Sequence, residues 1–357
     1  MRLRVCVIAS SRFPIAEPFA GGLEAHTHAL ARALVARGHE VTIYAAAGSD
    51  PELAVRTLDV APFDPTDLAR RDVAAPPDAW MREHHAYLAL MLELQRTGRH
   101  RFDVVHNNSL HHLPVAMAGV LDVPMVTTLH TPPTPWLESA MRLSAAASTF
   151  VAVSGSTAAQ WAQSVVPRVI HNGVDVGRWR PGPGGTDAVW FGRLVPEKAP
   201  HLAIDAARIA GMPLVLAGPC HDSAYYDREI APRLGGRIRY AGHLDSAQLV
   251  HLVGRSAVAV VTPRWEEPYG LVAAEAIACG TPVAAFARGG LAELVGPDSG
   301  RLCAPDDTAA LARAMREAAG LPRPRVRASA EHHLSLDAMV DGYERVYRDL
   351  VATPIAA

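Results

Sequence analysis

Two glutamates at a fixed spacing could bind a polar ligand. Glu267 lies in a turn after a predicted buried strand, and Glu275 follows eight positions later among small apolar residues. A carboxylate in such surroundings is costly unless a partner satisfies it, and the paired hydroxyls of a ribose are a natural partner. The helix carrying Glu275 is predicted to begin near residues 269–270, so its unpaired N–H groups favour an anion there. A solvated helix face is the alternative interpretation of Glu275.

Two cations lie close together in a second segment, 190–200. Arg193 follows the end of a predicted strand, and Lys198 is predicted to start the next helix. Arginine binds phosphate as a fork and lysine as a compact point charge, so the pair suits a diphosphate. Lys198 is the one lysine among 34 Lys and Arg residues, which indicates a position where a guanidinium is too bulky. A surface lysine left by chance is the alternative.

A pair of glycines, Gly21 and Gly22, opens a helix after the first predicted strand. Glycine at a helix N-terminus lets backbone N–H groups approach an anion closely. An ordinary turn before a helix is the alternative. The segment lacks the G-x-G-x-x-G pattern of a dinucleotide-binding turn, which argues against a nicotinamide-dependent oxidoreductase.

The histidines give no metal-binding pattern. His26 and His28 are two residues apart on a predicted helix and so point to different faces. The adjacent pairs have no cysteine or carboxylate at ligand spacing: His84–His85, His111–His112 and His332–His333. We expect surface or capping roles for all of these histidines, His26 and His28 included. No D-x-D motif stands in a suitable loop, so we expect no metal and no other cofactor. Cations and helix N-termini would supply the charge compensation for a diphosphate.

The elements that position these residues fall into two series. Apolar runs without polar alternation predict parallel strands covered by helices on both faces. The first series has strands at 3–9, 40–45, 104–106, 125–129 and 150–153, with helices at 22–37, 78–96 and 157–165. The second has strands at 188–191, 213–217, 237–241, 257–261 and 282–285. The predicted fold is α/β, with two tandem doubly wound (Rossmann-like) parallel-sheet domains and a ligand site in the cleft between them.

A Pro/Gly-rich break at 178–186 separates the two series. We expect an N-terminal domain over residues 1–168 and a C-terminal domain over residues 169–335. A last helix, about 336–352, is expected to dock rather than to form a free tail, because it carries an apolar stripe at helical spacing: Met339, Val340, Tyr343, Val346, Tyr347 and Leu350.

Composition limits the function classes. The 357 residues carry a formal net charge of −2, and 49% are hydrophobic. That balance is typical of a globular protein and gives no global field for nucleic acid or an anionic membrane. The four cysteines form no C-x-x-C pair, as in a reducing compartment, and no segment approaches the ~20 apolar residues that span a bilayer. We expect a cytoplasmic protein without a nucleic-acid partner; peripheral membrane contact and oligomeric state stay open.

Together these segments resemble glycosyltransferase family 4, the retaining enzymes of the two-domain fold called GT-B. The resemblance covers nearly the whole chain. Its most specific parts are Gly192-Arg-Leu-x-x-Glu-Lys198 and an E-x7-E signature, in which Pro268-Tyr-Gly270 fixes Glu267 as the first acid. Further matches are Gly21-Gly22-x-Glu24, Thr128-Leu-His130, Ala152-Val-Ser154 and His171-Asn-Gly-Val-Asp175. The chain departs from the family pattern at Ala199-Pro200 and at Gly218-Pro-Cys220.

The resemblance implies a role for each matched residue in binding a nucleotide diphosphate sugar, the donor. Arg193 and Lys198 would bind the diphosphate, with backbone contacts from Gly22 of the other domain. Glu275 would hold the ribose hydroxyls, and Glu267 would contact the donor sugar. The remaining contacts would come from His130 at the sugar, from the backbone of Tyr269, Gly270 and Leu271 at the β-phosphate, and from Gly242, His243 and Leu244 at the base. The N-terminal domain would bind the acceptor, and the last helix would pack back on it.

The implied reaction is sugar transfer with retention of the anomeric configuration. Arg193, Lys198 and the helix N-terminus at Gly270 would stabilise the departing diphosphate. Glu267 would position and stabilise the reacting sugar, and His130 would complete the catalytic set. The sequence of the second domain looks most like that of bacterial enzymes that use UDP-sugars, so UDP-glucose or UDP-N-acetylglucosamine is the expected donor.

The acceptor is expected to be a small molecule or a glycan. GDP-mannose is the alternative donor, which would make the protein a mannosyltransferase. An NDP-sugar epimerase and a non-catalytic sugar-nucleotide binding module are the rival functions on this scaffold. A phosphorylase is disfavoured, because it needs a lysine for pyridoxal phosphate and Lys198 is already assigned to the diphosphate.

Overall fold

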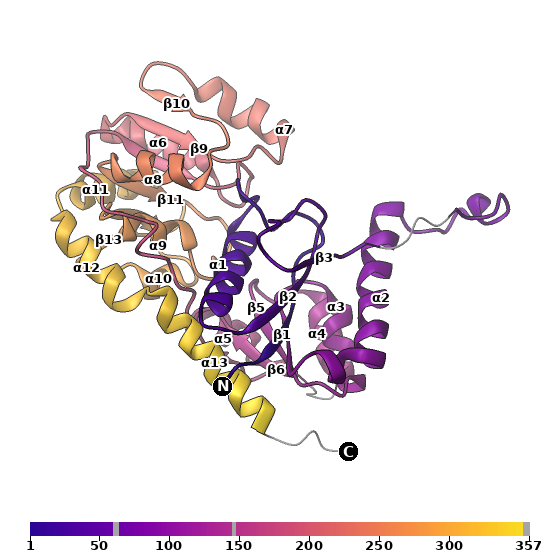
Figure 1. Ribbon diagram of the computed structural model, residues 1–357. Helices are drawn as coiled ribbons and strands as arrows, with labels where there is room; N and C mark the ends of the chain where they lie inside the picture. The colour runs from indigo at the N-terminus through magenta and orange to yellow at the C-terminus, as the bar shows by residue number, and fades with distance from the viewer. Residues whose placement is uncertain (60–63, 145–147, 353–357) are drawn as a thin grey trace.

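The computed structural model describes residues 1–59, 64–144 and 148–352. They form two parallel sheets, one in each half of the chain, with helices packed around both (Figure 1). The predicted α/β class with two doubly wound sheets is confirmed. In this part of the chain, no helix combines the length and the apolar character needed to cross a bilayer.

The first sheet has seven strands in the order β3-β2-β1-β4-β5-β6-β7. Its strands are β1 (Arg4–Ile8), β2 (Glu40–Ala45), β3 (Val55–Thr57), β4 (Val104–Asn107), β5 (Met125–Leu129), β6 (Ser148–Ala152) and β7 (Arg168–Val169). The order reverses direction between β1 and β4, which is where a doubly wound sheet opens its crevice. Its helical segments are α1 (Gly22–Ala36), η1 (Ala69–Arg71), α2 (Asp78–Arg101), α3 (His112–Ala116), η2 (Ala118–Val120), α4 (Pro135–Leu143) and α5 (Gly155–Trp161).

The second sheet has six strands in the order β10-β9-β8-β11-β12-β13. They are β8 (Ala188–Phe191), β9 (Leu214–Ala217), β10 (Ile238–Tyr240), β11 (Val258–Val261), β12 (Val283–Phe286) and β13 (Gly300–Cys303). Its helical segments are α6 (Pro200–Ala210), α7 (Ser223–Tyr225), η3 (Tyr226–Ile230), η4 (Ala231–Arg233), α8 (Ser246–Gly254), α9 (Leu271–Ala278), α10 (Leu291–Leu294), α11 (Thr308–Ala319) and α12 (Arg323–His333).

The last helix, α13 (Leu336–Ala352), crosses back to the first sheet (Figure 1). Its predicted stripe faces inward: Tyr343 and Tyr347 are fully buried against the core under β1 and β2. The hydroxyl of Tyr347 lies 2.6 Å from Nδ1 of His106, and that of Tyr343 lies 3.1 Å from Oγ1 of Thr128. These hydrogen bonds join α13 to the ends of β4 and β5, directly beneath the cleft.

Candidate active site

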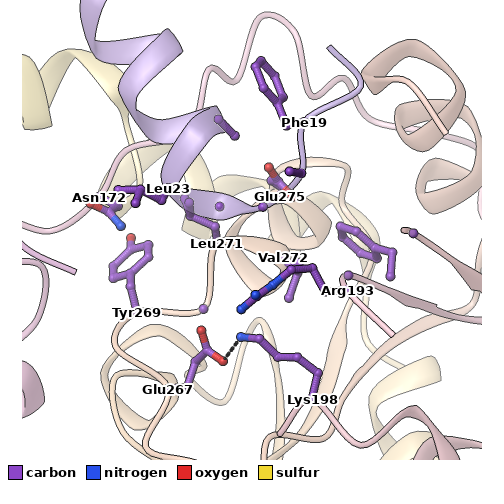
Figure 2. Close-up of a pocket in the computed structure, with 18 of the residues that line it drawn as sticks. Phe19, Leu23, Asn172, Arg193, Lys198, Glu267, Tyr269, Leu271, Val272 and Glu275 are labelled. Atoms are coloured by element: carbon purple, nitrogen blue, oxygen red, sulfur yellow. Dashed lines mark hydrogen bonds and ion pairs between the residues drawn. The ribbon is translucent and has the colours of Figure 1, made fainter. Parts of the chain in front are cut away.

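A cavity of about 260 Å³ lies between the two domains (Figure 2). Its lining residues follow the carboxyl ends of β1, β4, β5, β6 and β7 in the first sheet and of β8, β9, β10 and β11 in the second. All the site residues predicted from the sequence line this cavity except Gly242. Gly242 has a φ of 83° and turns the chain out of β10, and its carbonyl accepts a hydrogen bond from the Gly218 N–H instead.

Lys198 and Glu267 face each other across the floor of the cavity (Figure 2). Nζ of Lys198 lies 2.5 Å from Oε2 of Glu267, and the indole N–H of Trp265 donates to the same oxygen at 3.0 Å. The ammonium also lies 4.8 Å from the centre of the Trp265 ring. These contacts fix one carboxylate and one cation in a place that is only partly open to solvent.

Lys198 does not start a helix, as the sequence suggested. Helix α6 begins at Pro200, and its N-cap Ala199 has the left-handed φ of 44°. Proline suits the first helical position because it lacks the N–H that would be unpaired there. Lys198 therefore sits in the turn before the helix, where its side chain is free of the helix surface and reaches Glu267. Ala199 stands where the family often has glycine, the residue that tolerates this conformation best.

Arg193 follows β8 and points toward the N-terminal domain. Its side chain lies beside Gly21, where an added Cβ would be 3.8 Å from the Arg193 side chain. Glu24, in the first turn of α1, is buried, which raises the pKa of its carboxyl, and the charge of Arg193 opposes this shift. Arg193 thus lies at the junction of the two domains, next to a helix N-terminus.

Two helix N-termini meet at the cavity. A Cβ added to Gly22, the first residue of α1, would lie only 3.1 Å from Cδ1 of Leu271, the first residue of α9. Gly270, the N-cap of α9, has a φ of 98°, and a Cβ there would meet the Leu291 side chain at 2.6 Å. Glycine is required at this turn, which directs the unpaired N–H groups of α9 into the cavity.

Glu275 lines the cavity one turn into α9. It makes no hydrogen bond or ion pair with the residues that the structure describes. Burial raises the pKa of its carboxyl to about 8, and the positive charge of Arg178 opposes this shift. A carboxyl with this environment is ready to exchange hydrogen bonds with hydroxyls of a ligand.

His130 follows β5 and faces the cavity from the N-terminal domain. Burial, with the neighbouring His26 and His106, keeps its pKa well below the usual value, so the imidazole is neutral. Its Nε2 lies 2.9 Å from Oδ1 of Asn108. His26 is itself buried, 4.8 Å from His130 between ring centres, and His28 lies 2.8 Å from Asp50. The expectation of surface roles was wrong for these two, because both faces of α1 are covered.

Residues that the sequence did not single out also line the cavity: Phe19, Asn172, Ser246 and Trp265. Oδ1 of Asn172 and the hydroxyl of Tyr269 are buried and have no hydrogen-bond partner in the described part of the chain, and both lie near the cavity in Figure 2. Asn172 belongs to the His171–Asp175 motif, and that motif could have identified it as a site residue from the sequence. His243 donates from Nε2 to the carbonyl of Phe19 at 3.1 Å, which joins the domains on the far side.

Contacts across the cleft also hold the domains together beside the cavity. The hydroxyls of Ser154 and Thr157 donate to the carbonyl of Pro268 at 2.6 and 3.1 Å. The carboxylate of Glu293 accepts from the N–H groups of Gly155 and Ser156, at the N-terminus of α5, at 2.9 and 2.6 Å. The turn that carries Glu267 is therefore bound directly to the first domain.

Three histidines that are separated in the sequence come together outside the cavity. Ligand atoms of His84, His111 and His112 all lie within 4.8 Å of one another, a juxtaposition that the sequence did not indicate. Nδ1 of His111 accepts from the N–H of Leu113, so its lone pair is engaged in capping α3. The rings of His111 and His112 are stacked, 4.3 Å apart and 26° from parallel.

Known proteins resemble this chain along most of its length. A family model described as Glycosyltransferase Family 4 matches residues 20–178, and one described as Glycosyl transferases group 1 matches residues 182–332. The chain is 32% identical over 345 residues to the glycogen synthase of Mycobacterium tuberculosis, which covers 83% of this chain and 82% of that protein. It is 30% identical over 409 residues to the D-inositol 3-phosphate glycosyltransferase of Mycolicibacterium smegmatis, with 97% and 92% covered.

Solved structures share the fold. HepE of Anabaena, in complex with UDP and glucose, superposes with a TM-score of 0.76 at 19% identity, covering 98% of this chain and 100% of that one. The sucrose-phosphate synthase of Thermosynechococcus elongatus gives a TM-score of 0.74 at 20% identity, covering 98% and 100%. At these identities the likeness establishes the two-domain architecture and no finer property.

Proposed function

Since the chain belongs to glycosyltransferase family 4, we propose that it transfers glucose or N-acetylglucosamine from a UDP-sugar to an acceptor hydroxyl, with retention of configuration. The family and its GT-B fold agree with the prediction from the sequence. A nucleotide-sugar donor is the general part of the proposal; UDP, retention and the transferred sugar are its specific parts. Two observations favour UDP over GDP. The sequence of the second domain resembles that of UDP-sugar-using enzymes, and a structural neighbour was solved in complex with UDP and glucose.

The observation that carries the proposal is the convergence of Arg193, Lys198 and the N-terminus of α9 on one cavity wall. Two cations and the positive end of a helix dipole suit a diphosphate leaving group, whose negative charge grows as the glycosidic bond breaks. Lys198 carries three N–H donors, and the contact with Glu267 uses one. The lysine can therefore bind a phosphate oxygen while it holds Glu267 in place.

The roles proposed for Glu275, Glu267 and His130 follow from where each lies relative to the phosphate-binding N-terminus of α9. Glu275 lies one turn beyond the N-terminus of α9, so it would hold the ribose hydroxyls while that terminus binds the phosphates. Glu267 would position the sugar from the domain that holds the donor, and neutral His130 would contact it from the other domain. Protein groups supply the charge compensation, and the reaction is proposed to need no metal.

A ligand panel followed by a product assay tests the proposal. Thermal unfolding with UDP, GDP and ADP should show the largest rise in midpoint with UDP, because ligand binding to the folded state raises its stability. Incubation with UDP-glucose or UDP-N-acetylglucosamine and an acceptor mixture should release UDP, and NMR of the product should show the donor's anomeric configuration. Binding without turnover would support a non-catalytic module, C4 inversion of the free donor an epimerase, and preference for GDP-mannose a mannosyltransferase.

A further inference from the structure

A cluster of six aromatic rings lies on α2, α3 and α4 of the N-terminal domain. These three helices pack together (Figure 1). Trp80 stacks on His84 with 5.1 Å between ring centres, and Trp136 meets Trp80 edge-on at 5.8 Å and His112 at 4.5 Å. His111 joins the cluster to Tyr87, on which it stacks at 4.2 Å. Trp80 and Trp136 remain 39% and 51% exposed, so part of each indole is open to solvent.

The cluster adjoins the cavity through two short segments. Leu110 lines the cavity, and His112 follows it by two residues, which the chain cannot separate by more than ~7 Å. Thr131 also lines the cavity, and Trp136, the second residue of α4, follows five residues later. Leu110 is itself 42% exposed. Two short stretches of chain, 110–112 and 131–136, therefore join the lining of the cavity to the cluster.

The cluster offers imidazole nitrogens for hydrogen bonding beside its aromatic rings. Burial and the neighbouring imidazoles lower the pKa values of His111 and His112, so both rings are neutral near pH 7. The charged groups that act on them, Arg12 and Glu83, pair with each other through two hydrogen bonds of 3.0 and 3.3 Å. Neutral imidazoles offset the desolvation of a phosphate or a carboxylate less than an unpaired cation would.

We propose that this cluster is the acceptor subsite and that it binds an uncharged pyranose ring of an oligosaccharide, stacked on Trp136 and Trp80. The inference rests on the proposed glycosyltransferase function and specifies the acceptor class. The apolar C–H face of a pyranose fits an exposed indole, while imidazole nitrogens at the edge can bind its hydroxyls. Of the acceptor chemistries among the relatives, a neutral glucan fits this surface and an inositol phosphate does not.

Direct binding measures the subsite independently of turnover. With UDP saturating, saturation-transfer NMR with maltohexaose, cellohexaose and chitohexaose should show at least one of them bound through its ring C–H protons. Trp136→Ala should weaken that binding about tenfold or more, and Trp80→Ala should weaken it as well. Leu143→Ala, at the exposed end of the same helix α4, is the matched control and should bind like wild type. UDP affinity should stay the same in all three variants.

Several outcomes would overturn the acceptor assignment while leaving the donor function intact. They are UDP binding with no oligosaccharide bound, wild-type oligosaccharide affinity in both tryptophan variants, and binding of inositol 3-phosphate that Trp136→Ala abolishes. Tight Zn²⁺ binding that is lost in His84→Ala would show a metal site there instead. Failure of the protein to bind any nucleotide would instead refute the proposed glycosyltransferase function. The oligosaccharide measurement would still test whether the aromatic cluster binds a sugar.

Discussion

Nζ of Lys198 and Oε2 of Glu267 lie 2.5 Å apart and join two turns that are distant in the sequence. One turn follows β8 and carries the proposed diphosphate-binding cations; the other follows β11 and carries the proposed sugar-binding acid. Both side chains are mostly buried, with 23% and 11% of their surface exposed. Removing either partner leaves the other as an uncompensated charge in a poorly solvated place, so the two act as a unit.

Replacing Lys198 tests that unit. Lys198→Ala should lower kcat/KM by about 10- to 100-fold, because a charge-assisted hydrogen bond contributes ~1.5–3 kcal/mol. Lys198→Arg should also lose activity, because the planar guanidinium is larger than the ammonium that fits between Glu267 and Trp265. Steady-state kinetics with the best nucleotide sugar measure both effects.

The matched control is Arg208→Ala, which removes an exposed cation from the last turn of helix α6, the helix that follows Lys198. That variant should keep wild-type kinetics. Near-wild-type kcat/KM in Lys198→Ala would remove the lysine from the diphosphate site.

Most of the strands that the sequence predicted are buried on both faces; the edge strand β10, with exposed Arg239, is an exception. Their apolar runs, such as Val258–Val261, carry an unambiguous signal. The missed strands β3, β7 and β13 are short edge strands with polar or exposed residues, for example Arg168 in β7. These strands form because they pair with a neighbouring strand. Their own residues do not show which strand that is, so the local sequence does not predict them.

The site residues also divide into those that local sequence predicts and those that depend on tertiary packing. Arg193, Lys198, Glu267 and Glu275 were predictable together, because the carboxyl ends of parallel strands meet at one edge of a sheet. The burial of His26 and the meeting of His84 with His111 were not, because they depend on how α13 and α2 pack. No local pattern encodes those contacts.

Glu275 should make the stability of the ligand-free protein depend on pH. Its raised pKa of about 8 means that the folded state keeps this proton after the unfolded chain has lost it. Between about pH 4.5 and 8 this group therefore lowers the unfolding free energy as pH rises, by ~1.4 kcal/mol per unit. Glu275→Gln removes the effect, so the variant should gain stability over wild type as pH increases to 8 and lose affinity for UDP.

Thermal unfolding of both proteins at pH 5, 7 and 8.5 gives the comparison. Glu266→Gln, at an exposed position in the turn after β11, is the control and should follow wild type. If the difference between Glu275→Gln and wild type does not change with pH, the carboxyl is not desolvated in solution.

Chelation tests the proposed metal independence. Arg193, Lys198 and the N-terminus of α9 are assigned the charge compensation that a bridging cation supplies elsewhere, so sugar transfer should persist in excess EDTA. Loss of activity that Mg²⁺ or Mn²⁺ restores would require a metal at the diphosphate, and loss that only Zn²⁺ restores would direct attention to His84, His111 and His112.

The contacts of Glu293 predict how the domains are held together. Although burial raises the pKa of this carboxyl, hydrogen bonds from Gly155, Ser156 and His171 outweigh the effect and lower it. Because the folded-state pKa is depressed, the stabilisation is present above the ordinary pKa near 4.5 and is lost as pH falls further. Glu293→Ala removes these bonds, so we expect a larger radius of gyration without ligand and weaker UDP binding, by about 3- to 10-fold.

Small-angle scattering with and without UDP, together with calorimetric titration of UDP, measures both quantities. Saturating UDP should return the variant to the wild-type radius, because a donor that touches Gly22 and Lys198 at once binds only the closed arrangement. Glu317→Ala removes a comparable but exposed carboxylate on α11 and should change neither quantity. A Glu293→Ala variant with wild-type radius and UDP affinity would mean that Ser154, Thr157 and His243 suffice to close the cleft.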